Sequence, residues 1–131
     1  MSKENVDVVR AMLDAWNERR MDAFRDLHDP NVAIMRFIEG WPEPEPVVGR
    51  DAVMDYFDAM RLWADDTADP ISDFIEAGGA VVVRFVWRTK TQGQEVGMEV
   101  TGVYTLRNAR VSVIEYFRDH AAALEAARLR E

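Results

Sequence analysis

Cysteine is absent from the sequence, which excludes a disulfide framework and a thiolate metal site. Lysine occurs only twice, and 24 acidic residues against 16 basic ones give a net charge of −8. Because proteins that bind nucleic acid take most of their affinity from clustered Lys and Arg, we expect no nucleic-acid partner. No apolar run approaches the roughly 18 residues that span a bilayer, and no signal-peptide stretch follows Met1, so we expect no membrane partner and a cytoplasmic location.

Patterns typical of common cofactor and nucleophile sites are also missing. The sequence has no P-loop or dinucleotide-binding glycine pattern and no serine–histidine–acid constellation. Its only histidines, His28 and His120, lie far apart. His28 and Asp29 alone are too few ligands for a metal, so we interpret His28 as part of a helix end. We therefore expect neither a metal nor a cofactor.

Length and periodicity predict one α+β domain over residues 1–131. The first half shows apolar spacings of three and four, typical of amphipathic helices. The second half shows the alternation of strands, separated by glycine and asparagine turns. The predicted helices cover residues 5–18, a short segment ending at Asp29-Pro30, a segment from Gly49 to an exit at Asp69-Pro70, and 120–130. The predicted strands cover 32–38, 71–77, 80–91, 95–107 and 110–117, with turns that include Gln92-Gly93-Gln94.

Several short motifs mark the ends and starts of these elements: Ala15-Trp16-Asn17, Met21-Asp22-Ala23-Phe24, Val48-Gly49-Arg50-Asp51-Ala52-Val53, Val103-Tyr104-Thr105-Leu106 and Glu115-Tyr116-Phe117. In this order they resemble the nuclear transport factor two-like superfamily, in particular its SnoaL-like branch. The resemblance implies a cone-shaped, curved antiparallel sheet. It also implies three N-terminal helices packed on the concave face, a short C-terminal helix, and a pocket at the open end. Members include ketosteroid isomerases, limonene-type epoxide hydrolases, polyketide cyclases and proteins without known activity, so the fold alone assigns no function.

The resemblance lets the family's chemistries be tested against the residues present. The isomerase pattern places its base and two hydrogen-bond donors at Arg36, Met12 and Val103, which cannot act in these ways, so we reject it. The epoxide hydrolase pattern places its arginine at Arg84 and one carboxylate at Glu115, but its second carboxylate falls on a valine. This chemistry is weakened and stays open. The cyclases use one acid in the last strand, a part that Glu115 could play.

Alternation in the strand over residues 80–91 leaves two interpretations. Arg84 and Arg88 share one face, while Phe85 and Trp87 share the other. The pattern alone makes the aromatic residues core and the arginines solvent-facing. The resemblance instead points Arg84 into the cone beside Glu115 and places Phe85 and Trp87 on the convex face, where a homodimer would cover them.

The predicted function is binding of a small, largely apolar organic molecule. Glu115 would act as acid or base and Arg84 would orient it, as in a cyclase, isomerase, lyase or hydrolase. Arg36 would add a second positive group that suits an anionic ligand, or would be an exposed strand residue. The alternative is a non-catalytic binding or dimerisation domain with a structural Arg84–Glu115 pair. Further residues predicted to line the pocket, or simply to fill the core, are Trp16, Trp41, Met60, Trp63, Arg88, Met98, Val100, Tyr104 and Phe117. Trp41 would be a lid over the pocket, or a plain surface anchor.

Overall fold

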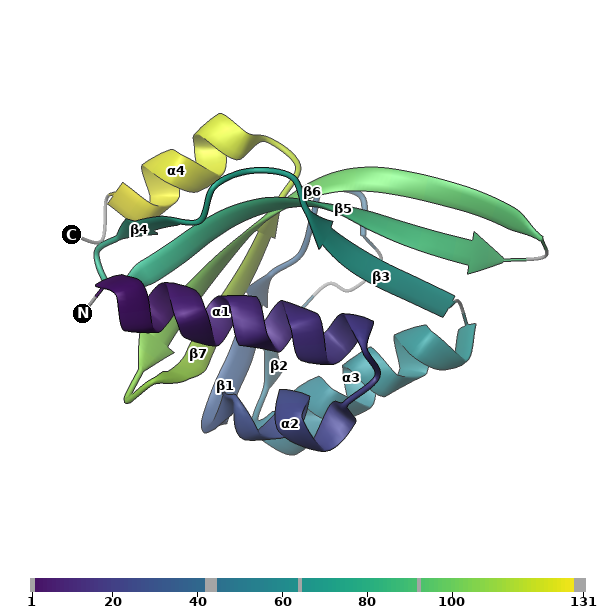
Figure 1. Cartoon of the computed structure of the whole chain (residues 1–131), viewed down its shortest axis with the longest axis horizontal. Coiled ribbons are helices and arrows are strands. Elements are labelled where there is room, and N and C mark those ends of the chain that lie inside the picture. The colour runs from purple at the N-terminus through teal and green to yellow at the C-terminus, as the bar shows by residue number, and fades with distance from the viewer. Residues whose placement is uncertain (1, 42–44, 64, 92, 129–131) are drawn as a thin grey trace.

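The structure of the protein is a computed structural model. It describes residues 2–41, 45–63, 65–91 and 93–128, and the side chains of these residues except 2–3, 61–63, 65 and 91. The helices are α1 (Ser2–Asn17), α2 (Met21–Asp26), α3 (Arg50–Trp63) and α4 (His120–Arg128) (Figure 1). The strands are β1 (His28–Arg36), β2 (Val47–Val48), β3 (Asp65–Pro70), β4 (Ile75–Ala77), β5 (Ala80–Thr91), β6 (Gln94–Arg107) and β7 (Arg110–Phe117).

The strands form one curved sheet in the order β2-β1-β7-β6-β5-β3, with β4 paired to β5 as well. Strands β1 and β7 run parallel, while the other pairs are antiparallel. The fold class is the predicted α+β cone, and the one parallel pair makes its sheet mixed rather than wholly antiparallel. In the described residues, no helix is long and apolar enough to cross a membrane.

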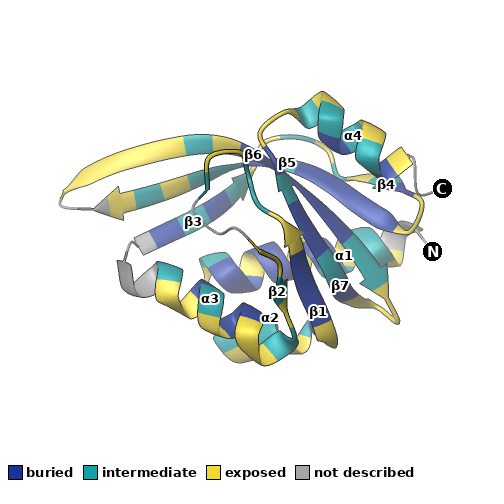
Figure 2. Ribbon diagram, turned by 180° about the vertical axis from the view of Figure 1, so that it is seen from behind, coloured by how far each residue is buried: buried dark blue, intermediate teal, exposed yellow. Residues whose placement is uncertain are grey.

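Helices α1, α2 and α3 cover the concave face of the sheet (Figure 1). On α1, Val9, Leu13 and Trp16 recur at helical spacing and are buried, and on α3 Val53 and Phe57 do the same. These side chains join the concave-facing residues of the strands in one large core. The far ends of β5 and β6 extend beyond the helices and are largely exposed (Figure 2).

Helix α4 packs on the opposite, convex face. Its buried residues Ala123 and Ala127 are small, which lets the helix lie close to the sheet. Val82, Val103 and Phe117 meet it from β5, β6 and β7 in a second, smaller core. Helices α1, α2 and α3 therefore pack on one face of the sheet and α4 on the other. Only strand residues whose side chains lie on the concave face can reach the concave interior.

Several boundaries differ from the sequence-based expectation. The strand expected over 71–77 is only β4, Ile75–Ala77, and the strand expected over 32–38 ends at Arg36. Helix α3 ends at Trp63, and the segment expected to be its exit forms β3, which runs antiparallel to β5. Strand β1 begins at His28 and so includes Pro30, which lacks a backbone donor. Its register against β7 shifts between His28 and Ala33, and this irregularity accommodates the proline.

Candidate functional site

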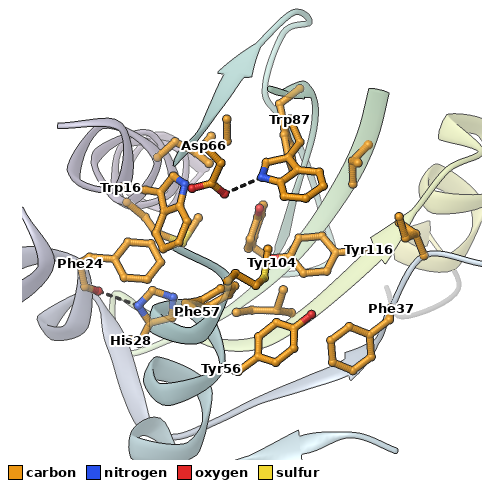
Figure 3. Close-up of a pocket in the computed structure, with 18 of the residues that line it drawn as sticks. Trp16, Phe24, His28, Phe37, Tyr56, Phe57, Asp66, Trp87, Tyr104 and Tyr116 are labelled. Atoms are coloured by element: carbon orange, nitrogen blue, oxygen red, sulfur yellow. Dashed lines mark hydrogen bonds between the residues drawn. The ribbon is translucent and has the colours of Figure 1, made fainter. Parts of the chain in front are cut away.

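A pocket opens between the concave face of the sheet and helices α1 and α3 (Figure 3). Its space amounts to about 740 Å³, a volume that includes the open solvent at its mouth. Most of the chain's aromatic residues line it: Trp16, Phe24, Phe37, Trp41, Tyr56, Phe57, Phe85, Trp87, Tyr104 and Tyr116. A pocket with such walls favours a flat, largely apolar guest.

Asp66 is the only charged side chain among the described residues that line the pocket. It lies on β3, is 2% exposed, and accepts a hydrogen bond at Oδ2 from Nε1 of Trp87 at 2.5 Å. The indole of Trp16 points toward the same carboxylate from the opposite side (Figure 3). A carboxylate held in this way at the wall of an apolar pocket has a fixed orientation, which acid–base chemistry requires.

Two phenols face this region from β6 and β7. Tyr104 and Tyr116 are hydrogen-bonded to each other, with ring centroids 6.4 Å apart and ring planes nearly perpendicular at 86°. Burial raises the pKa of both side chains above the ordinary value of 10, and the neighbouring Tyr104, Tyr56 and Asp66 raise that of Tyr116 further. Both phenols are therefore neutral near pH 7 and can donate hydrogen bonds.

Trp41 contacts two other residues that line the pocket. Its Nε1 donates to the hydroxyl of Tyr56 on α3 at 2.6 Å, and its ring meets that of Trp87 at 75° with centroids 5.9 Å apart. The connection that carries Trp41 is thus joined to both α3 and β5. The indole also lines the pocket, and its expected role as a lid stays a prediction.

His28 lies at the start of β1 and is fully buried. Its Nδ1 is 2.7 Å from the carbonyl oxygen of Phe24, which can only accept, so Nδ1 carries the proton (Figure 3). Burial lowers the pKa of His28 from 6.5 to about 4; the bond to Phe24 opposes this shift and the charge of Arg50 adds to it. The imidazole is therefore a neutral member of the pocket wall.

The profile of the SnoaL-like domain matches residues 9–114 of the chain. The protein belongs to the SnoaL-like family. This match covers all of the sheet except the last residues of β7, and both sides of the pocket. No curated protein sequence matches the chain closely enough to count as a relative.

Solved structures share the fold of this SnoaL-like chain at low sequence identity. A protein of unknown function from Burkholderia pseudomallei, described as NTF2-like, is 21% identical, with a TM-score of 0.74 over 95% of this chain and 97% of its own. An epoxide hydrolase from M. tuberculosis, described as LEH-like, is 15% identical, with a TM-score of 0.75 over 97% and 93%. TerC, co-crystallised with polyporic acid, is 17% identical, with a TM-score of 0.76 over 96% and 98%. Identities this low show a shared fold only.

Five residues expected from the sequence to lie at the pocket are among those that line it: Trp16, Trp41, Met60, Val100 and Tyr104. Met98 is partly buried and packs against the same core. The side chain of Trp63 lies outside the described part of the chain. The sequence thus predicted five of the 19 described residues that line the pocket of this SnoaL-like domain.

The expectation that Arg84 points into the pocket is wrong. Phe85 and Trp87 line the pocket instead, and Arg84 lies on the other face of β5, where its Nε is 3.8 Å from Oε1 of Glu99. Arg88 shares that face and pairs with Asp69 at 3.0 Å. A homodimer through Phe85 and Trp87 loses its basis, because Phe85 is 5% exposed and both rings face the concave interior.

Glu115 also lies on the convex side, between Ile114 and Tyr116, which line the pocket. Its strand neighbours are Val103 on β6 and Arg36 on β1. Arg36 in turn lies over the ring of Phe117, 4.5 Å from its centroid, and Phe117 packs under α4. The predicted set of Arg36, Arg84, Arg88, Glu115 and Phe117 therefore lies on the face of the sheet that is turned away from the pocket.

The polar residues that do line the pocket were missed for identifiable reasons. Asp66 lies in a segment that was interpreted as the end of a helix. In the structure this segment is strand β3, in which Asp66 and Ala68 are buried on either side of Thr67. Tyr116 was noted only as part of a motif, because Glu115 beside it was taken to face inward. His28 was interpreted as a helix end, although its side chain is buried at the pocket.

Proposed function

We propose that this SnoaL-like domain binds a largely apolar, ring-containing molecule with a carbonyl group and catalyses proton transfer at the carbon next to it. Asp66 is the general base, and the pair of Tyr104 and Tyr116 holds the carbonyl oxygen. Proton transfer of this kind is the shared first step of isomerisations, aldol-type cyclisations and eliminations, so the proposal defines a reaction type and leaves the product open.

The observation that carries the proposal is a buried carboxylate and a neutral phenol pair within one aromatic pocket. Asp66 is 2% exposed, and its charge contributes to raising the pKa of Tyr116, which places the two groups within electrostatic reach of each other. A base and a hydrogen-bond donor that face the same apolar space are what removal of a proton beside a carbonyl requires.

The proton balance of the step is simple. The C–H bond next to the carbonyl breaks, its proton goes to a carboxylate oxygen of Asp66, and the electron pair moves onto the carbonyl oxygen to give an enolate. One hydroxyl proton is used within the Tyr104–Tyr116 hydrogen bond, so the pair has one left to donate to the enolate oxygen. The protonated Asp66 then returns its proton to the same or a neighbouring carbon.

Hydrogen–deuterium exchange tests this step without the natural substrate. The probe is 2-tetralone, a bicyclic ketone with acidic C–H bonds, dissolved in D₂O and followed by ¹H NMR. We expect the protein to accelerate exchange over buffer and Asp66→Asn to reduce the acceleration by roughly 10²- to 10⁴-fold. Asp69→Asn is the matched control, since Asp69 lies on the same strand but pairs with Arg88 on the other face. Equal exchange by the wild type and Asp66→Asn would remove Asp66 from the role of base.

A second candidate is binding without catalysis. It is favoured by the partners that the pocket's polar groups already have inside the protein: Trp87 for Asp66, and the two tyrosines for each other. Quenching of the fluorescence of Trp16, Trp41 and Trp87 by 2-tetralone would measure binding separately. Binding together with exchange no faster than in buffer would support this candidate and contradict the catalytic one.

A further inference from the structure

The end of helix α1 holds the strand that carries Asp66. The side-chain amide of Asn17 makes two hydrogen bonds to the backbone of Ala68. Nδ2 of Asn17 donates to the carbonyl oxygen of Ala68 at 2.8 Å, and the backbone N–H of Ala68 donates to Oδ1 of Asn17 at 2.8 Å. Strand β3 is the last in the sheet order and pairs with β5 on one side only. Asn17 thus occupies the place of a further strand at the open edge of β3.

A second contact from the same helix end reaches Asp66 itself. Arg19 has a positive φ of 63°, an uncommon backbone conformation for a residue with a side chain. Its guanidinium Nη1 donates to the backbone carbonyl oxygen of Asp66 at 2.8 Å. Asp66 and Ala68, on either side of Thr67, are therefore both attached to the helix end, and the side chain of Trp16 points to the carboxylate of Asp66 (Figure 3).

We infer that Asn17 is a positioning residue for Asp66, which acts by holding the edge of β3 at Ala68. A general base loses much of its effect when it is displaced by about 1 Å, and Asn17 holds the edge of β3 that its pairing with β5 leaves open. The inference rests on the proposed role of Asp66 as base, but the geometry it describes can be tested without any substrate.

The test observes the indole N–H of Trp87, which donates to Asp66 Oδ2 at 2.5 Å. A short bond to a carboxylate moves such a proton downfield in the ¹H–¹⁵N NMR spectrum, and Trp87→Phe assigns the signal. Asn17→Leu is close in size but can make neither hydrogen bond, and we expect it to move the Trp87 signal upfield, toward its position in Asp66→Asn. Glu18→Gln is the control, because the side chain of Glu18 is exposed and pairs with Arg20 at 3.2 Å, and we expect no shift.

A variant that acts through Asp66 should change more than stability. We expect Asn17→Leu to slow the exchange of 2-tetralone hydrogens while leaving its binding, measured by fluorescence quenching, nearly unchanged. Asn17→Asp keeps the acceptor for the Ala68 N–H but loses the donor, and we expect an intermediate effect. A folded Asn17→Leu protein with an unshifted Trp87 signal would overturn the inference.

The wild-type protein provides a test that needs no variant. The Ala68 amide proton should exchange slowly with D₂O, because it is bonded to Asn17, and fast exchange would also overturn the inference. If the Trp87 signal shifts in Asn17→Leu but Asp66→Asn has no effect on ketone exchange, Asn17 positions Asp66 as inferred and the proposed proton transfer is wrong. The two failures are therefore distinguishable.

Discussion

Gly102 lies directly beneath the phenol of Tyr104. A Cβ atom at residue 102 would be 2.6–2.7 Å from three atoms of that side chain, its hydroxyl oxygen included, which is closer than Cβ atoms approach other groups. Across the ladder, Gly102 is paired with Tyr116 on β7. The missing side chain therefore gives Tyr104 the space to lean along its own strand and reach the hydroxyl of Tyr116.

Gly102→Ala should break this arrangement. The added methyl group has to push the Tyr104 ring away, which costs about 1–3 kcal/mol of unfolding free energy as overpacking. It should also weaken hydrogen bonding to a bound ketone. Urea denaturation and 2-tetralone binding measure the two effects. Gly97→Ala on the same strand is the control, since its Cβ would meet only side-chain atoms of Val86 and Arg88, at 3.3 Å or more, on the convex face. An equal loss of ketone binding in both variants would contradict this account.

His28 should make the fold sensitive to mild acid. Its pKa is about 4 when folded and 6.5 when unfolded, so between these values the unfolded chain binds the extra proton. The contribution of His28 to stability is complete above pH 6.5 and is lost as the pH falls through 4. Its full size is about 3 kcal/mol. Urea denaturation between pH 4 and 7 should show a shallower pH dependence for His28→Gln than for the wild type. An equally steep pH dependence in His28→Gln and the wild type would contradict this account.

The phenol pair should make the fold sensitive to alkali. Burial raises the pKa of Tyr104 and Tyr116 in the folded protein above 10, so the unfolded chain loses these protons first. The contribution of both residues to stability is complete below pH 10 and is lost as the pH rises through their folded values. Absorbance at 295 nm should show these two residues ionising only as the protein unfolds. Full, reversible ionisation of all tyrosines in a folded protein near pH 10 would contradict the burial of the pair.

The face of β5 on which Arg84 lies depends on the register between β5 and β6. The family resemblance, and no register, was the reason for expecting Arg84 inside the pocket. A register one residue away from the observed one, with Arg84 opposite Gly102, would place it on the pocket face. The structure pairs Thr91 with Gln94, so Arg84 lies opposite Thr101 and faces away. Because side chains alternate along a strand, this single step reverses the faces of the whole of β5. The alternation alone, with aromatic residues inward, was the better guide.

Glu115 faces outward because of a similar one-residue change of register, here between β6 and β7. From the paired Arg107 and Arg110, an unbroken ladder would place Glu115 opposite Gly102 on the pocket face. The register shifts between Thr105 and Leu106, and beyond this bulge Glu115 lies opposite Val103. A bulge leaves no reliable mark in a single sequence. The helices and the lining residues Trp16, Met60 and Val100 were expected from hydrophobic spacing, whereas the polar residues depend on these register details.

Trp41 and Tyr56 should control how fast a guest leaves the pocket. Trp41 Nε1 donates to the Tyr56 hydroxyl at 2.6 Å. We take the connection that carries Trp41 as the rim of the pocket, and this bond joins it to α3. Tyr56→Phe removes the acceptor and keeps the ring, so the rim should open more easily while the aromatic wall stays in place. Stopped-flow fluorescence should then show faster association and faster dissociation of 2-tetralone, with a smaller change in the dissociation constant. If Tyr56 were instead a direct contact to the ketone, Tyr56→Phe would raise the dissociation rate alone. Trp41→Phe separates these cases further, because it breaks the same hydrogen bond from the other side and should reproduce the kinetics of Tyr56→Phe only if the rim is what both residues control.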